Sequence, residues 1–137
     1  MFILDTNVVS ELRKPARASV RVTEWASRIA SVELYLSAMS VLELELGILR
    51  MERKDRRQGT ELRKWMEGQV LIEFAGRVLP VDTTVALRCA GLHVPNPMPE
   101  RDAMIAATAL VHKMTIVTRN TRDFERTGVA TINPWLG

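Results

Sequence analysis

The chain has a single cysteine, Cys89, among its 137 residues, which excludes an internal disulfide. A chain without disulfides suits the reducing cytoplasm. No apolar stretch approaches the roughly 20 residues that are needed to span a bilayer. The apolar run Met1–Leu4 meets Asp5 too early to form the core of a secretory signal. These absences predict a cytoplasmic protein that does not associate with membranes.

Phosphate-binding glycine loops are also missing. Neither G-x-x-x-x-G-K nor G-x-G-x-x-G occurs, which argues against nucleotide hydrolases and dinucleotide-dependent enzymes. The two histidines, His93 and His112, do not have the His-x₃-His spacing of a zinc site. They also offer no close pair that would activate a ribose 2′-hydroxyl. Any hydrolysis of RNA would therefore depend on another source of nucleophile.

Hydrophobic residues make up 47% of the chain, which suits a single globular domain over residues 1–137. Short apolar runs alternate with stretches of helical periodicity, and this alternation predicts a parallel sheet that is covered on both faces, in an α/β/α sandwich. A polar turn is predicted around Gln58-Gly59. The predicted strands are Met1–Leu4, Leu34–Ser37, Val78–Val81, Thr115–Val117 and Val129–Ile132; the predicted helices are Asn7–Arg13, Val20–Ala30, Val41–Arg53, Glu61–Phe74, Thr84–Leu92 and Asp102–Lys113.

Four acidic residues stand where a predicted strand ends or a helix begins. The carboxyl ends of parallel strands meet at one edge of a sheet, where open α/β sheets place their ligands. Clustered carboxylates repel one another, and hard cations such as Mg²⁺ or Mn²⁺ relieve that repulsion. The sequence therefore predicts a metal site for phosphate chemistry built from Asp5, Glu43, Asp102 and Asp123.

Each acid also has a purely structural interpretation. Ser40-x-x-Glu43 matches a capping box, Asp102 stands at a helix N-cap, Asp5 is placed to cap the first helix and Asp123 to form an Asx-turn. Independent caps need not all lie at one edge of a sheet, so the conjunction favours the metal site. Residues that could hold outer waters or orient the carboxylates are Asn7, Thr118 and Asn120.

Basic residues are concentrated between Arg50 and Lys64, where seven of them face three acids, a larger excess than the +3 of the whole chain. Such a segment can hold a phosphate backbone, and it can equally be a solvated helical surface. The residues predicted to contact RNA are Arg53, Lys54, Arg56 and Arg57.

Two other folds that begin with a strand and an aspartate fit less well. Phosphatases with a D-x-D signature need a second carboxyl two residues on, and that position is Asn7. A response-regulator receiver would need a lysine at a later strand end, where this chain has Thr118-Arg119.

The chain resembles PIN-domain ribonucleases, in particular the VapC/FitB-like toxins of bacterial toxin–antitoxin pairs. The resemblance runs through the whole chain in the family's order and has no gap at an acidic position. It rests on four segments, of which the second includes Gly47: Ile3-Leu4-Asp5-Thr6-Asn7, Ser40-Val41-Leu42-Glu43-Leu44, Asp102-Ala103-Met104-Ile105-Ala106-Ala107-Thr108-Ala109 and Val117-Thr118-Arg119-Asn120-Thr121-Arg122-Asp123-Phe124.

This resemblance implies a five-stranded parallel sheet and four acids that bind one or two Mg²⁺ or Mn²⁺ ions. It also implies an RNA substrate, a small antitoxin that blocks the site, and homodimers that assemble further with that antitoxin. The resulting hypothesis is a metal-dependent endoribonuclease toxin that leaves a 5′-phosphate and a 3′-hydroxyl. The alternatives are a catalytically silent nucleic-acid-binding or regulatory module on the same fold and, less well supported, a metal-dependent phosphatase.

Overall fold

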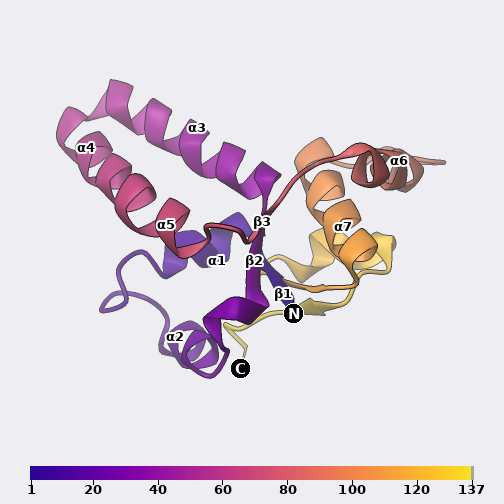
Figure 1. Ribbon diagram of the computed structural model, residues 1–137, viewed down its shortest axis with the longest axis horizontal. Helices are drawn as coiled ribbons and strands as arrows, with labels where there is room; N and C mark the ends of the chain where they lie inside the picture. Colours follow the sequence, from indigo (N-terminus) through magenta and orange to yellow (C-terminus); the bar gives the residue numbers. More distant parts are fainter. Residues whose placement is uncertain (137) are drawn as a thin grey trace.

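The computed structural model describes residues 1–136, and its centre is a parallel sheet of five strands in the order β3-β2-β1-β4-β5 (Figure 1). The first strand, β1, lies in the middle and pairs with β2 on one side and β4 on the other. All four strand pairs are parallel, as the sequence predicts. The strands are β1 (Phe2–Leu4), β2 (Leu34–Ser37), β3 (Val78–Leu79), β4 (Thr115–Val117) and β5 (Thr131–Ile132).

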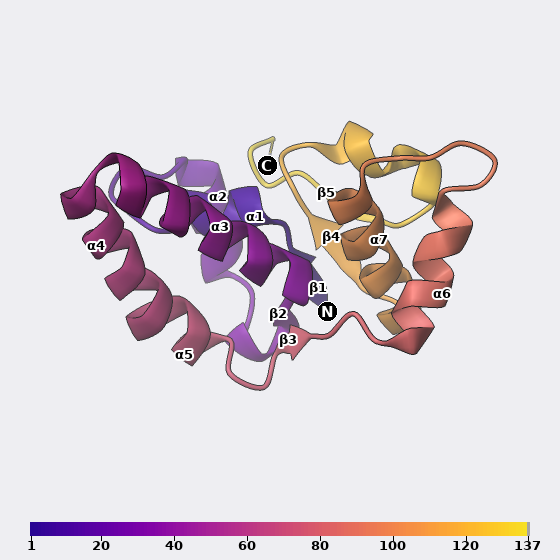
Figure 2. The same ribbon diagram turned by 90° about the horizontal axis from the view of Figure 1, so that it is seen from above.

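Helices cover both faces of this sheet. One layer holds α1, α2 and the long α3–α4 hairpin with α5, and the α6–α7 pair lies on the opposite side (Figures 1 and 2). The helical elements are α1 (Thr6–Glu11), α2 (Val20–Ser27), η1 (Ser31–Glu33), α3 (Ala38–Lys54), α4 (Arg56–Trp65), η2 (Met66–Val70), α5 (Leu71–Glu73), α6 (Thr83–Leu92), α7 (Glu100–His112) and η3 (Thr121–Thr127). The predicted three-layer α/β/α sandwich is confirmed.

The strands are apolar on both faces because each face is covered. Successive residues of a strand point to opposite faces. Leu4 and Val117 accordingly join the core beneath α1 and α3, whereas Ile3 and Ile116 join a second core beneath α7. All four side chains are almost fully buried. Continuous apolar runs of this kind are what a doubly covered parallel sheet requires.

The turn between α3 and α4 differs from its prediction. Gln58 and Gly59 lie inside α4, and the chain reverses at Asp55, whose carboxylate accepts a hydrogen bond from the Gln58 amide at 3.1 Å. Gly59 is needed for close packing, because a Cβ there would stand 2.6 Å from Cα of Glu52. Gly59, which predicted a turn, therefore marks the place where the two helices pack closely.

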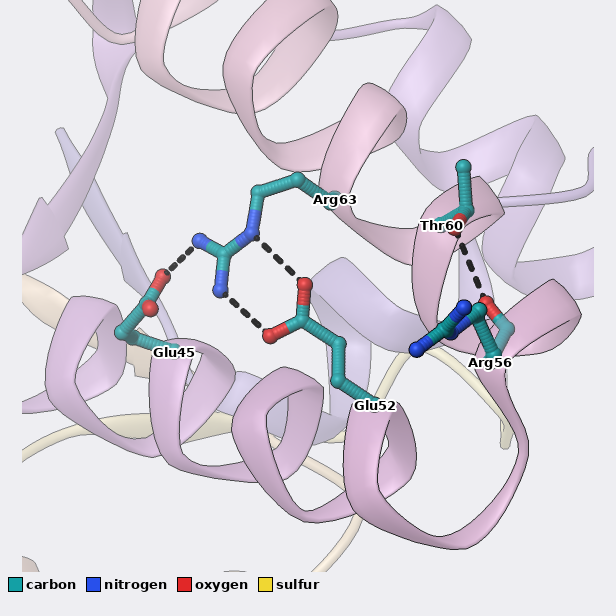
Figure 3. A network of polar contacts seen from close by, with 5 residues as sticks. All are labelled: Glu45, Glu52, Arg56, Thr60 and Arg63. Atoms are coloured by element: carbon teal, nitrogen blue, oxygen red, sulfur yellow. Dashed lines mark hydrogen bonds and ion pairs between the residues drawn. The ribbon is translucent and has the colours of Figure 1, made fainter.

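An arginine joins the two arms of this hairpin. Arg63 of α4 donates to Glu45 at 2.6 Å and to Glu52 at 3.1 and 3.3 Å, both on α3 (Figure 3). The Glu45 hydrogen bond is the main cause of the raised pKa of Arg63, and it lowers the pKa of Glu45 in turn. The hairpin is thus held along its length by packing at Gly59 and by charge at Arg63.

Among residues 1–136, no helix is long and apolar enough to pass through a membrane.

Two predicted strands, Leu34–Ser37 and Thr115–Val117, match the structure at both ends. Among the helices that begin earlier than predicted are α3, at Ala38, and α7, at Glu100. Both shifts change the structural interpretation of an acid.

Candidate active site

Asp5 follows the central strand directly, at the carboxyl edge of the sheet. Its amide donates to the Val117 carbonyl of β4 at 2.9 Å, which continues the β1–β4 pairing up to the acid. The chain continues from β1 to β2 and β3 on one side of the sheet, whereas β4 and β5 lie on the other side, so the strand order reverses at β1. Asp5 therefore occupies the position where open α/β sheets bind ligands. Only 8% of Asp5 is exposed.

Two donors, a hydroxyl and an amide, hold the Asp5 carboxylate. The Thr118 hydroxyl donates to one oxygen at 2.8 Å and the Thr6 amide to the other at 2.8 Å. Burial nevertheless raises the pKa of Asp5; these two hydrogen bonds oppose the rise, and the charges of Glu43 and Asp123 add to it. Asp5 is thus both the N-cap of α1 and a member of an acidic cluster.

Glu43 does not belong to a capping box. The N-cap of α3 is Ser37, whose hydroxyl accepts from the Met39 amide at 3.0 Å, so Ser40 lies within the helix. Glu43 instead accepts a hydrogen bond from the Thr6 hydroxyl at 2.7 Å. Ser40, one turn earlier, is fully buried, and its hydroxyl has no partner in the part of the chain that the structure describes. The capping interpretation of Glu43 was wrong because α3 starts at Ala38.

Asp102 is not an N-cap either. Helix α7 is preceded by Pro99, and Asp102 is its third residue, in the first turn. Burial raises the pKa of Asp102 to about 6, and the charges of Asp5, Asp123 and Glu43 contribute in that order. The charges of the other three carboxylates therefore all act on Asp102.

Asp123 is placed by η3, a short helical segment after β4. Its amide donates to the Asn120 carbonyl at 3.1 Å, and no amide of residues 1–136 donates to its side chain. The expected Asx-turn at Asp123 is therefore absent from the described chain. The charge of Asp123 raises the pKa of both Asp5 and Asp102.

The polar residues beside the acids have unequal roles. Thr118 is fully buried and acts directly on Asp5. Asn7 contacts the Thr118 hydroxyl at 3.5 Å and the Arg119 amide at 3.4 Å, which are long for hydrogen bonds. Asn120 reaches Thr118 through its backbone amide, at 3.0 Å.

Sequence reasoning missed two residues of the site. Thr6 bridges Asp5 and Glu43, but in the sequence it is only the residue between Asp5 and the predicted helix Asn7–Arg13. Arg101 approaches Glu43 at 3.8 Å and is the cation nearest the cluster among the described ion pairs. Its position next to Asp102 was the only available signal.

The donor set suits a hard divalent cation, because it consists of carboxylates whose charges raise the pKa values of Asp5 and Asp102, and of hydroxyls that orient Asp5 and Glu43. Within the described residues, however, no three Asp, Glu, His or Cys side chains already form a coordination shell. The site therefore suits a divalent cation through the chemical type of its side chains and through their grouping, and not through a coordination shell that is already formed.

The basic segment forms the tip of the α3–α4 hairpin, far from α6 (Figure 2). Arg63 is committed to its two glutamates, whereas the four residues predicted to contact RNA are exposed and make no ion pair within residues 1–136. Ten residues of α3 separate Glu43 from Arg53, a distance of about 15 Å along the helix axis. These exposed cations are Arg53, Lys54, Arg56 and Arg57.

Known proteins resemble this chain over nearly all of its length. VapC ribonuclease Y4jK of Sinorhizobium fredii is 41% identical over 98% of this chain and 98% of its own. Toxin FitB of Neisseria gonorrhoeae is 36% identical over 98% of this chain and 99% of its own. The crystal structure of FitAcB from Neisseria gonorrhoeae superposes with a TM-score of 0.89 at 36% identity, over 98% of this chain and 99% of that one.

The match to a family extends from the first strand to the segment before β5. Residues 2–130 fit the family described as PIN domain. All four acids and the central strand fall within these bounds. The chain belongs to the PIN domain family.

Proposed function

We propose that the protein is a metal-dependent endoribonuclease that acts as the toxin of a toxin–antitoxin pair. The observation that carries this proposal is the cluster of Asp5, Glu43, Asp102 and Asp123 at the carboxyl edge of the sheet, with the pKa of Asp102 raised to about 6. Relatives named as a VapC ribonuclease and as Toxin FitB support it. The proposal takes residues 1–137 as one PIN domain.

The four acids would hold Mg²⁺ or Mn²⁺, which lowers the pKa of a water molecule and neutralises phosphate charge when bound. Thr118 and Thr6 orient the carboxylates of Asp5 and Glu43 through the hydrogen bonds described above. In the absence of a cation, Asp102 takes up a proton near pH 6. The exposed cations at the hairpin tip bind the RNA backbone at a distance from the cut, and the products carry a 5′-phosphate and a 3′-hydroxyl.

The partners in this proposal are RNA and a small antitoxin that blocks the acidic cluster, with homodimers that assemble further around that antitoxin in the cytoplasm. The rival functions are less well supported. A silent binding module does not need four acids grouped closely enough to raise the pKa values of Asp5 and Asp102. A phosphatase of the D-x-D type needs a proton donor where this chain has Asn7.

Cleavage of single-stranded RNA by the purified chain tests the proposal. We expect cleavage with Mg²⁺ or Mn²⁺ and none in excess EDTA, with activity restored when the metal is returned. Asp5→Asn serves as the matched inactive variant and guards against a contaminating nuclease. Cleavage that continues undiminished in EDTA, or in the Asp5→Asn protein, would contradict the mechanism.

A further inference from the structure

A groove of about 360 Å³ runs from the acidic cluster along the hairpin. Glu43 and Thr6 are among its lining residues, so the groove is continuous with the site. The rest of its lining includes Ser10 and the aliphatic Leu44, Ile48 and Leu62, and it is completed by Arg13, Gly47 and Trp65. No part of the mechanism described so far uses these three residues.

Gly47 explains why the groove is open. It lies one helical turn after Glu43 in α3, and residues four apart share a helix face. A Cβ at this position would meet no heavy atom within 4 Å, whereas one at Gly59 would collide with Glu52. Glycine destabilises the interior of a helix. At position 47 neither close packing nor a positive φ requires a glycine. The missing side chain leaves space beside Glu43 for something that is not part of the fold.

The walls of the groove match the chemistry of a nucleotide. Trp65 supplies an aromatic surface, on which the bases of single-stranded nucleic acids stack without regard to sequence. Arg13 forms no ion pair within the described chain, so its guanidinium is available for a phosphate. We propose that this groove binds the nucleotide next to the scissile phosphate, with its base against Trp65 and its outer phosphate near Arg13.

A second cavity, of about 450 Å³, also touches Trp65, and its walls are different. Its lining is dominated by apolar residues such as Leu4, Val9 and Phe74, and Glu73 is its one charged residue. An anionic chain has nothing to pair with there. The groove that contains Arg13 and ends at the acids is therefore the one suited to RNA.

This inference rests on the proposed ribonuclease activity and is tested beside it. Gly47→Leu fills the groove, and Gly91→Leu in α6 is its matched control, since a Cβ at Gly91 also meets nothing within 4 Å. The probe is a pool of short random-sequence RNA oligonucleotides with Mn²⁺, followed by kinetics and by sequencing of the cut ends. Gly47→Leu should raise KM roughly tenfold, the effect expected when one base no longer stacks. It should also change the nucleotide preference on one side of the cut.

Two further measurements separate a blocked groove from a damaged site. The rise in melting temperature on adding Mn²⁺ should be retained in Gly47→Leu. Trp65→Leu, which removes the aromatic surface, should raise KM and change the nucleotide preference in the same direction as Gly47→Leu. If Gly47→Leu does not fold, Arg13→Gln must raise KM where the neighbouring Arg17→Gln does not.

The outcomes are distinguishable. If the parent cuts RNA and Gly47→Leu does so with unchanged KM and preference, the groove assignment is overturned and the ribonuclease proposal stands. The groove assignment also falls if Gly47→Leu releases a protein that co-purifies with the parent while RNA kinetics stay the same, because the groove then holds a polypeptide. A parent that neither binds nor cuts the pool overturns both proposals.

Discussion

The hydroxyl of Thr118 donates to Asp5 at 2.8 Å, and the two residues are 113 positions apart in the sequence. Thr118 follows β4 and Asp5 follows β1, so this bond spans the two strands at the centre of the sheet. It opposes the effect of burial on the pKa of Asp5. The neutral Thr118 thus favours the ionised form of Asp5, which is buried.

Thr118→Val should remove this donor while keeping the shape of the side chain. A buried hydrogen bond to a charged group contributes about 2 kcal/mol, so the variant should lose roughly that much stability at neutral pH. The loss should shrink as the pH falls through the pKa of Asp5, because a protonated carboxyl needs the donor less. Urea unfolding in EDTA at several pH values measures it.

The control for this variant is Thr115→Val in β4, since the Thr115 side chain makes no hydrogen bond within residues 1–136. It should leave stability unchanged or slightly higher, because valine suits a strand. Equal losses in the two variants would show that Thr118 is only a packing residue.

Asp102→Asn tests whether the acidic cluster is a site or a set of caps. Two carboxylates about 5 Å apart repel by roughly 3 kcal/mol at an effective dielectric near 20, before screening and proton uptake reduce the value. The metal-free variant should therefore melt at the parent's temperature or above it. It should also lose most of the stabilisation that Mg²⁺ or Mn²⁺ gives by mass action, together with RNA cleavage.

Asp82→Asn is the matched control, because Asp82 is a true N-cap whose side chain accepts from the Val85 amide at 3.0 Å. Asparagine and aspartate cap about equally well, so this variant should resemble the parent in every assay. An Asp102→Asn protein that keeps both its metal-induced shift and its cleavage would remove Asp102 from the site.

The pKa of Asp102 predicts how stability and metal binding depend on pH. Its folded-state pKa of about 6 lies above the ordinary value of 3.8, so the folded protein takes up a proton that the unfolded chain does not. The resulting stabilisation is fully present below 3.8 and is lost as the pH rises through 6. Parent and Asp102→Asn should consequently differ in the pH dependence of unfolding in EDTA over this window.

Metal affinity should change in the opposite sense. Protons and Mn²⁺ compete for the same carboxylate, so calorimetric titration should show weaker binding as the pH falls below about 6. Affinity that stays constant from neutral pH to about pH 5 would mean that Asp102 does not contact the metal.

The sequence predicted the layers and the sheet because both depend on local apolar patterns and on strand order. It also placed the four acids at one edge, since the carboxyl ends of parallel strands must meet there. It failed where two segments determine a property together. Gln58-Gly59 looked like a turn because the closeness of Glu52 to Gly59 is not visible in sequence. Thr6 was missed for the same reason, because its partner, Glu43, lies on another helix.

Neutralising the four exposed cations of the hairpin tip tests their contact with RNA. Arg53 and Lys54 end α3, where positive charge favours the helix dipole, but Arg56 and Arg57 open α4, where it does not. Helix stability therefore does not account for the second pair. Changing all four residues to Gln should weaken RNA binding and reduce the log–log salt slope by roughly 0.7 for each single-strand phosphate that is no longer neutralised.

The matched control changes Arg28 and Arg88 to Gln, because both are exposed and neither forms an ion pair in the part of the chain described. Removal of these charges lowers the net charge of the protein without touching the hairpin, so binding should weaken little and the slope should stay close to that of the parent. Fluorescence anisotropy of a labelled RNA oligonucleotide across a range of salt concentrations measures both quantities. The double variant Arg56→Gln/Arg57→Gln removes the same number of charges as this control. If the two double variants reduce the slope equally, the RNA responds to net charge alone. A larger decrease of the slope in the hairpin-tip variant would show that the RNA backbone contacts the tip. The tip lies about 15 Å along α3 from Glu43, a distance that a few nucleotides of single strand can bridge.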